Sequence, residues 1–137
     1  MFDKLLPIKG ENMLLEPNAI VLYVNDLTLT SNFYQDLLGI TPEEASPTFH
    51  DFKLSNGMSL ALKAQHSVEP PAEGKNGNCE LAFTLDDNQK VDDLFAAWQA
   101  KEINIIIPPN VVPYGYTFVA TDPDGNRLRI VSLVKSN

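Results

Sequence analysis

One permanently charged residue lies in a segment that otherwise has the composition of a buried strand. Arg129 belongs to "NRLRIVSL" (126–133), which directly follows the turn sequence "DPDG" (122–125). A guanidinium has no lone pair to donate and stays protonated in proteins, so Arg129 can serve neither as a metal ligand nor as a general base. The chemistry open to it is electrostatic: it can pair with a carboxylate or orient a bound molecule.

Other side chains capable of chemistry are few. His50 and His66 are the only histidines, and an imidazole could carry a proton near neutral pH. His50 lacks an obvious orienting carboxylate, so we interpret it as the polar wall of a pocket. His66 lies in the polar Pro/Gly-rich stretch and is interpreted as a surface residue. Asp122 and Asp124 are interpreted as turn formers. The sequence contains no Ser–His–Asp grouping, phosphate loop or zinc-type cysteine pattern.

The elements that must position these residues occur twice in the same order. A predicted strand, "AIVLYVNDL" (19–27), precedes an amphipathic helix, "TLTSNFYQDLLG" (28–39), with Leu29, Phe33 and Leu37 on one side. A loop, "TPEEASP" (41–47), leads to a hairpin around Ser55-Asn56-Gly57. The second half repeats this order from "ELAFTLDD" (80–87), with Val91, Leu94, Phe95 and Trp98 on one helical stripe.

We therefore predict an α+β protein made of two paired βαβββ modules. The predicted boundaries are an N-terminal extension (1–16), a first module (17–66), a polar Pro/Gly-rich linker (67–78) and a second module (79–137). At 137 residues, the chain has room for one domain or for two small modules that share a core.

The strands have two different faces because successive side chains point to opposite sides. One face is uniformly large and apolar and is expected under the helices, where burial stabilises by ~25 cal/mol per Å². Counting pairs outward from two-residue turns places Arg129 opposite Phe118 and Ala61 opposite His50. The other, mixed face is then predicted to hold Tyr23, His50, Phe52, Ala61, Lys63, Glu80, Tyr116, Phe118 and Arg129.

This mixed face is partly aromatic and carries a few charges, which is typical of a ligand pocket. The alternative is that the aromatic side chains fill the space themselves or form a dimer contact. Composition narrows the ligand class. A net charge of −8 argues against nucleic acid and anionic lipid, and favours neutral or cationic ligands.

The cellular compartment can be predicted from three sequence features. No apolar run approaches ~18 residues, so no membrane-spanning segment is expected. The first 18 residues are too polar for a signal peptide. A single cysteine, Cys79, excludes an internal disulfide, and we expect it to be half-buried beside a strand. These features predict a cytoplasmic protein.

Two motifs carry a family resemblance. "LYVNDLTLTSNFYQDLLGI" (22–40) and "DPDGNRLRIV" (122–131) resemble the vicinal oxygen chelate superfamily, which includes glyoxalase I, extradiol dioxygenases, and fosfomycin- and bleomycin-resistance proteins. The resemblance covers nearly all of residues 18–134. It implies a cup-shaped mixed sheet with helices on its outer face, usually in a homodimer. In some members, modules from different chains build the cup.

The resemblance also implies four metal-ligand positions, which here read Ala19, Ala61, Glu80 and Arg129. Alanine has no donor atom, and a guanidinium ~4 Å from a divalent ion would repel it by about 8 kcal/mol at an effective dielectric of ~20. We therefore expect no metal ion and no cofactor. The resemblance places Arg129 where the ion would lie, with Glu80 as its partner, either filling the site or orienting a ligand.

Three functions follow as hypotheses. The favoured one is a metal-free, homodimeric protein of the bleomycin-resistance type that sequesters a hydrophobic or aromatic small molecule, such as an antibiotic. The second is a lyase, isomerase or dioxygenase of the same superfamily with shifted or no metal ligands. The third is a regulatory or assembly module whose aromatic residues are consumed at an interface.

Overall fold

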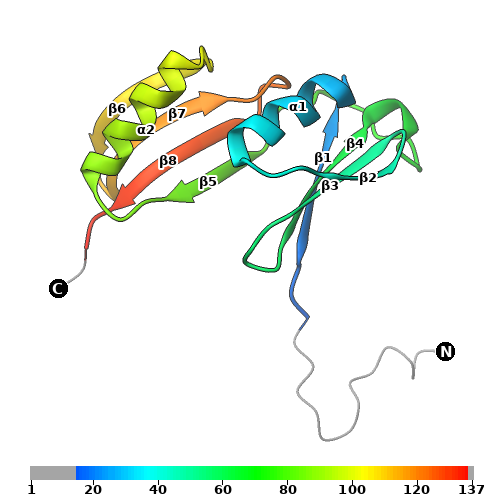
Figure 1. Cartoon of the computed structure of the whole chain (residues 1–137), viewed down its shortest axis with the longest axis horizontal. Coiled ribbons are helices and arrows are strands. Elements are labelled where there is room, and N and C mark those ends of the chain that lie inside the picture. The colour runs from blue at the N-terminus through cyan, green and yellow to red at the C-terminus, as the bar shows by residue number, and fades with distance from the viewer. Residues whose placement is uncertain (1–14, 136–137) are drawn as a thin grey trace, which may run out of the picture.

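The computed structural model describes residues 15–135, and most of the predicted N-terminal extension lies outside them. The first module comprises β1 (Ala19–Val24), α1 (Leu27–Leu38), β2 (Glu43–Ser46), β3 (Phe49–Lys53) and β4 (Ser59–Ala64). The second comprises β5 (Glu80–Thr84), α2 (Asn88–Ala100), β6 (Ile105–Val112), β7 (Gly115–Thr121) and β8 (Arg127–Leu133). The doubled βαβββ order is confirmed (Figure 1). The predicted loop 41–47 was wrong, because it contains β2.

Each module forms its own four-stranded mixed sheet. The strand orders are β1-β4-β3-β2 and β5-β8-β7-β6. The first strand of each module pairs with the last in parallel, and the remaining pairs are antiparallel. The outer edges of β1 and β5 therefore have no strand partner within the described part of the chain. No helix among residues 15–135 is long and apolar enough to cross a membrane.

Both helices begin at an aspartate that caps them. The Asp26 carboxylate accepts a hydrogen bond from Leu29 N, and the Asp87 carboxylate accepts one from Lys90 N; a cap of this kind satisfies one of the unpaired N–H groups of the first turn. The inward stripe of α2 is as predicted. In α1, however, Leu29 is 56% exposed, because the buried side is formed by Leu27, Thr30, Ser31 and Tyr34.

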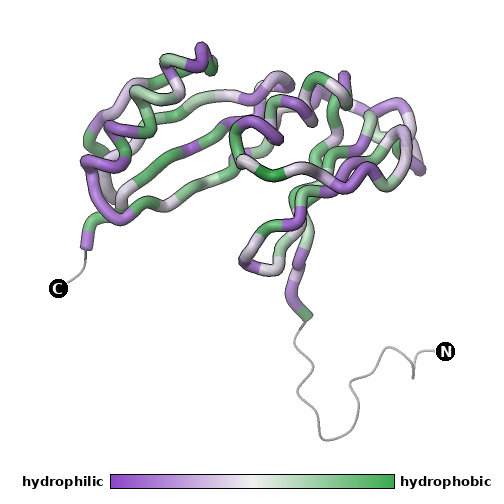
Figure 2. Tube along the Cα trace, viewed as in Figure 1, coloured by the Kyte–Doolittle hydropathy of each residue, from purple (hydrophilic) through white to green (hydrophobic). Residues whose placement is uncertain are grey.

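The apolar sides of the strands pack under the helices, as expected. The core cluster comprises Leu22, Val24, Leu27, Tyr34, Phe52, Leu60, Leu62, Val91, Trp98, Phe118, Ala120, Leu128 and Ile130. Phe118 is central in the second module, where its ring makes edge contacts with Phe95 and Trp98 at centroid distances of 5.3 and 5.5 Å. Figure 2 shows hydrophobic stretches along the strands, with polar residues frequent in the loops.

Both hairpins have three-residue turns, which corrects the predicted pairing. Leu54 N donates to Met58 O across one turn, and Asp122 N donates to Asn126 O across the other. The third turn residue is glycine in each, and Gly57 and Gly125 both have φ of +92°. A type I turn that ends in a left-handed residue has this form. Each strand pair is therefore shifted by one residue from a two-residue turn.

The shift moves four predicted residues to the other face. Arg129 lies opposite Val119, not Phe118, and Ala61 lies opposite Asp51, not His50. Because the side-chain period of a strand is two, a slip of one residue exchanges the faces completely. The prediction that His50, Phe52, Tyr116 and Phe118 share a face with Arg129 was therefore wrong; they lie on the helix side.

The "DPDG" turn of the second module binds α1 of the first. The Asp124 carboxylate accepts hydrogen bonds from Asn25 N at 3.0 Å and Thr30 Oγ1 at 2.9 Å. The Tyr34 hydroxyl donates to Asp122 Oδ2 at 2.6 Å. The two aspartates form their own turn, as predicted, and also join the modules, which was not predicted.

Candidate functional site: the open face of the sheets

The side of each sheet opposite the helices is called the open face from here on. Its residues follow from the strand registers, since paired residues point to the same side. In the first sheet they are Ala19, Val21, Tyr23, Glu43, Phe49, Asp51, Lys53, Ser59, Ala61 and Lys63. In the second they are Glu80, Ala82, Thr84, Thr117, Val119, Thr121, Arg127, Arg129 and Val131. No residue of either group belongs to the core cluster under the helices.

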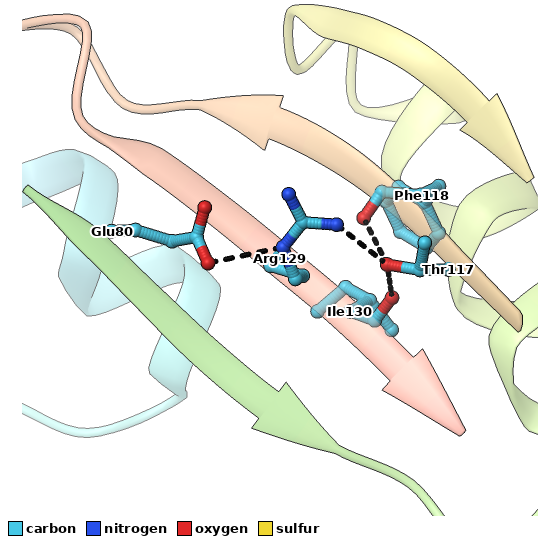
Figure 3. Close-up of polar contacts among 5 residues, drawn as sticks. All are labelled: Glu80, Thr117, Phe118, Arg129 and Ile130. Atoms are coloured by element: carbon cyan, nitrogen blue, oxygen red, sulfur yellow. Dashed lines mark hydrogen bonds and ion pairs between the residues drawn. The ribbon is translucent and has the colours of Figure 1, made fainter. Parts of the chain in front are cut away.

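An ion pair lies across the second sheet. Arg129 Nε is 3.0 Å from Glu80 Oε2, and Arg129 Nη1 is 3.4 Å from Thr117 Oγ1. Figure 3 shows the guanidinium of β8 between Glu80 on β5 and Thr117 on β7. Thr117 is only 1% exposed although no helix covers this face, so neighbouring side chains, including Arg129, cover it. The expected pairing of Arg129 with Glu80 is confirmed.

The energetic contribution of this pair is small. The Arg129 side chain is 20% exposed and the Glu80 side chain 40% exposed, so solvent screens their attraction. Half-exposed pairs of this kind contribute roughly 0–1 kcal/mol. The pair holds the guanidinium in a fixed position, but Nη2 forms no hydrogen bond with any described residue.

The residues at the four positions where the resemblance implies metal ligands do not fit a metal ion. Ala19 and Ala61 offer no donor atom, and Glu80 is the only carboxylate, already engaged with a guanidinium. A divalent cation needs several oxygen or nitrogen ligands. Within residues 15–135, no group of three or more His, Cys, Asp or Glu side chains is placed to hold one.

A row of three side chains crosses the open face of the first sheet. Tyr23 of β1 pairs with Lys63 of β4, which pairs with Phe49 of β3. The Lys63 ammonium lies 5.9 Å from the centre of the Phe49 ring, within cation–π range. Tyr23 is 41% exposed. The aromatic and cationic character predicted for this face is therefore present, with Phe49 in place of Phe52.

Asp51 is a second residue that sequence reasoning missed. Its side chain is 14% exposed, and Oδ2 binds Lys53 Nζ at 2.8 Å. Its Oδ1 is buried without a hydrogen-bond partner among the described residues. The signal that could have found both Asp51 and Phe49 is the glycine at the third position of each turn, because it indicates a three-residue loop.

The residues that moved to the helix side have structural partners there. His50 Nδ1 is 2.8 Å from Ser31 Oγ of α1. The Tyr116 hydroxyl donates to Asp92 Oδ1 of α2 at 2.7 Å, and this hydrogen bond raises the pKa of Tyr116. Phe52 and Phe118 are fully buried. These contacts tie each sheet to its helix.

The hollows on the described surface do not gather the predicted residues into one cavity. Tyr23 lines a hollow of about 290 Å³ against the linker, and Glu80 lines one of about 240 Å³ at the module junction. His50 and Tyr116 line two others, beside α1 and α2. Ala61, Lys63 and Arg129 line none of these four. These hollows therefore do not join into one pocket over the open face in one copy of the chain.

Two proteins with similar sequences align over most of this chain. The phenazine antibiotic resistance protein EhpR of Enterobacter agglomerans is 29% identical over 120 residues, which cover 85% of this chain and 92% of that protein. A protein of Agrobacterium tumefaciens with a solution NMR structure is 40% identical, with a TM-score of 0.77, covering 89% of this chain and all of that one.

The fold is also shared with more distant proteins. A glyoxalase/bleomycin resistance protein/dioxygenase from Nocardioides is 19% identical, with a TM-score of 0.78, over 99% of this chain and 92% of its own. Residues 16–130 match the Glyoxalase/Bleomycin resistance protein/Dioxygenase superfamily as a whole. With its doubled βαβββ fold and this match over most of its length, the chain belongs to that superfamily.

Proposed function

We propose that this protein binds a planar aromatic antibiotic of the phenazine class on its open face, without a metal ion and without converting it. Affinity would come from stacking and burial, with aromatic contacts worth ~0.5–1.5 kcal/mol each beyond burial. The exposed ring of Tyr23 and the neighbouring Phe49 provide this surface. EhpR, a relative over most of the chain, is named for resistance to such a compound.

The observation that carries the proposal is the Glu80–Arg129 ion pair. In a superfamily whose enzymes place metal ligands on these strands, this chain has a guanidinium bonded at 3.0 Å to the only carboxylate of the set. A site of this chemistry suits holding a molecule rather than activating it through a cation. This arrangement supports sequestration over metal-dependent catalysis.

Direct titration tests the proposal. The purified full-length chain is titrated with phenazine by calorimetry, before and after dialysis against EDTA, and the bound compound is recovered for mass spectrometry. We expect saturable binding that chelation leaves unchanged, and unaltered phenazine. Binding that chelation abolishes and zinc or nickel restores would contradict the metal-free part. Conversion of the compound would favour the enzyme hypothesis, and no binding would reject the proposal.

A matched pair of tyrosines locates the site. Tyr23 is 41% exposed and Tyr114, in the turn between β6 and β7, is 47% exposed. Tyr23→Ala should weaken phenazine binding at least severalfold, because it removes one aromatic surface. Tyr114→Ala should leave the affinity at the wild-type value. Equal effects of the two substitutions would place the ligand elsewhere.

We also propose that the protein is a homodimer. On the helix side of β1, Leu22 and Val24 are buried but Ile20 is 41% exposed, and the adjoining edge has no strand partner among the described residues. A second copy would cover this edge and supply a further wall for the open face. Light scattering should find a dimer, and Ile20→Lys should make it monomeric, whereas Leu29→Lys, on the exposed side of α1, should not. A monomeric wild type would reject the dimer.

The single cysteine bears on the cellular compartment in which the protein acts. Cys79 proved to be exposed rather than half-buried. An exposed free thiol persists best in a reducing environment, so the cytoplasm is the proposed site of action.

A further inference from the structure

Lys63 is the centre of an unusual arrangement on the first sheet. Its ammonium has an aromatic residue on either side, Tyr23 on β1 and Phe49 on β3. Adjacent strands lie ~4.8 Å apart, so the two aromatic residues are separated by about 10 Å across the row. A flat multi-ring molecule laid along this row would contact both rings and the ammonium at once.

The ammonium of Lys63 has no carboxylate partner in the part of the chain that the structure describes. Its one hydrogen bond to a described residue goes to Thr48 Oγ1 at 3.4 Å, which leaves two N–H donors without a partner among residues 15–135. Two of the other three cations on this face are paired: Lys53 with Asp51 and Glu43, and Arg129 with Glu80. The third, Arg127, forms no ion pair among the described residues and lies on the second sheet, away from the row. Lys63 therefore differs from Lys53 in having positive charge that is not neutralised locally.

The open face is less acidic than the chain as a whole. Its four cations are Lys53, Lys63, Arg127 and Arg129, and its three carboxylates are Glu43, Asp51 and Glu80. The whole chain has 10 basic and 18 acidic residues. On the first sheet, where Lys63 lies, two cations and two carboxylates balance. The chain-wide charge favours neutral or cationic ligands, but an anion near Lys63 meets a locally balanced face and an ammonium that has no carboxylate partner among the described residues.

From these observations we infer that the ligand is a planar aromatic carboxylate and that Lys63 binds its carboxylate group. The inference rests on the proposed function, because it assigns the acidic group of a ligand whose rings stack on the same face. A single ammonium between two rings matches one carboxylate attached to a ring system. Nucleic acid and anionic membranes require a broad basic surface, which this acidic chain does not present.

The test compares two phenazines that differ in charge and little in shape. Phenazine-1-carboxylate and its neutral amide, phenazine-1-carboxamide, are titrated into the full-length protein at neutral pH and low salt. We expect the acid to bind up to about fivefold more tightly, because an ion pair at a half-exposed position contributes only modestly. Raising the salt to 0.5 M should reduce the ratio by screening and leave the affinity for the amide nearly unchanged.

Variants assign the preference to one residue. Lys63→Met keeps most of the aliphatic stem and should bring the acid-to-amide ratio to about one, with the amide affinity retained. Lys63→Arg should restore the preference. The matched control is Lys53→Met, which removes a cation from the same face that already has carboxylate partners at 2.8 and 3.8 Å. It should keep the wild-type ratio.

The outcomes separate the inference from the proposed function. If the acid and the amide bind equally to the wild type, or if Lys63→Met keeps the preference, recognition of an acid by Lys63 is wrong and phenazine binding stands. If neither compound binds, nor unsubstituted phenazine, both are wrong. Should Lys63→Met fail to fold by circular dichroism, the salt dependence of the wild-type ratio decides.

Discussion

Asp122 and Glu80 are both carboxylates that hold a side chain from another element, yet their surroundings differ. Asp122 is 4% exposed and accepts hydrogen bonds from the Tyr34 hydroxyl, from Asn126 Nδ2, and from the backbone N–H groups of Asp124 and Asn126. Glu80, on a side chain 40% exposed, has a single partner, Arg129. A buried and fully satisfied carboxylate holds the fold together, whereas the half-exposed pair leaves donors free for a ligand.

The largest effect should come from removing the buried carboxylate. Asp122→Ala leaves the Tyr34 hydroxyl and two backbone N–H groups without their acceptor, so we expect a loss of about 3–4 kcal/mol in the free energy of unfolding. Urea denaturation followed by circular dichroism measures it. Asp86→Ala, which removes an exposed carboxylate paired with Lys90, should leave the midpoint unchanged. Equal midpoints for the two variants would deny Asp122 its structural role.

The linker glycine beside this turn should have the next largest effect. Gly77 has φ of +87°, and a Cβ there would clash with the backbone carbonyl oxygen of Asp124. Gly77→Ala should destabilise by about 2–3 kcal/mol, from backbone strain and displacement of the turn. Gly74→Ala separates the two causes, because its φ is +105° with nothing within 4 Å of the new Cβ. If Gly74→Ala is equally damaging in urea, contact with the turn contributes nothing.

Tyr34 makes stability depend on alkaline pH. Burial, and then the charge of Asp122, raise the pKa of Tyr34 far above its usual range. A tyrosine in the unfolded chain ionises near ~10, so stability present below that pH should fall above it, by ~1.4 kcal/mol per pH unit. Tyr34→Phe should lose about 1–2 kcal/mol at neutral pH and remove this contribution above pH 10.

Thermal unfolding from pH 8 to 11 measures the slope for wild type, Tyr34→Phe and Tyr114→Phe. The last variant, at an exposed position, should keep the wild-type profile. A Tyr34→Phe profile parallel to that of the wild type throughout would show that the buried hydroxyl is not the source of the slope.

The smallest effect on stability should come from the open face. Arg129→Met removes a half-exposed ion pair and should lower the free energy of unfolding by less than about 1 kcal/mol. Glu80→Gln should behave similarly, and the double variant should show a coupling of roughly 0.5 kcal/mol or less. If Arg129→Met lowers the free energy of unfolding as much as Asp122→Ala does, the ion pair is structural and the contrast between the two carboxylates is wrong.

The doubled order of the modules and the two faces of β1, β4, β5 and β8 could be predicted from the sequence. Alternation of apolar residues depends only on the strand itself, so Arg129, Glu80 and Lys63 were assigned to the correct side. The faces of β3 and β7 also depend on turn length. Counting two turn residues instead of three reversed both, which placed Phe52 and Phe118 wrongly and missed Phe49 and Asp51.

Contacts between residues far apart in the sequence could not be predicted, for a different reason. Nothing local to Asp124 indicates that its carboxylate meets Asn25 and Thr30, which are 99 and 94 residues away. Such contacts depend on how the two sheets dock, and local patterns of residues do not specify docking. The same holds for the hydrogen bond of His50 to Ser31, which assigns that imidazole to the helix side.

The hydrogen bonds from Asn25 and Thr30 to Asp124 have a consequence for biogenesis. Although the βαβββ unit repeats, the hydroxyls of Thr30 and Tyr34 in α1 find their acceptors only after the turn between β7 and β8 has been synthesised. An isolated N-terminal half would hold the hydroxyls of Thr30 and Tyr34 without these acceptors. The two modules therefore repeat in fold but not in independence, because the first depends on the second to complete its hydrogen bonds.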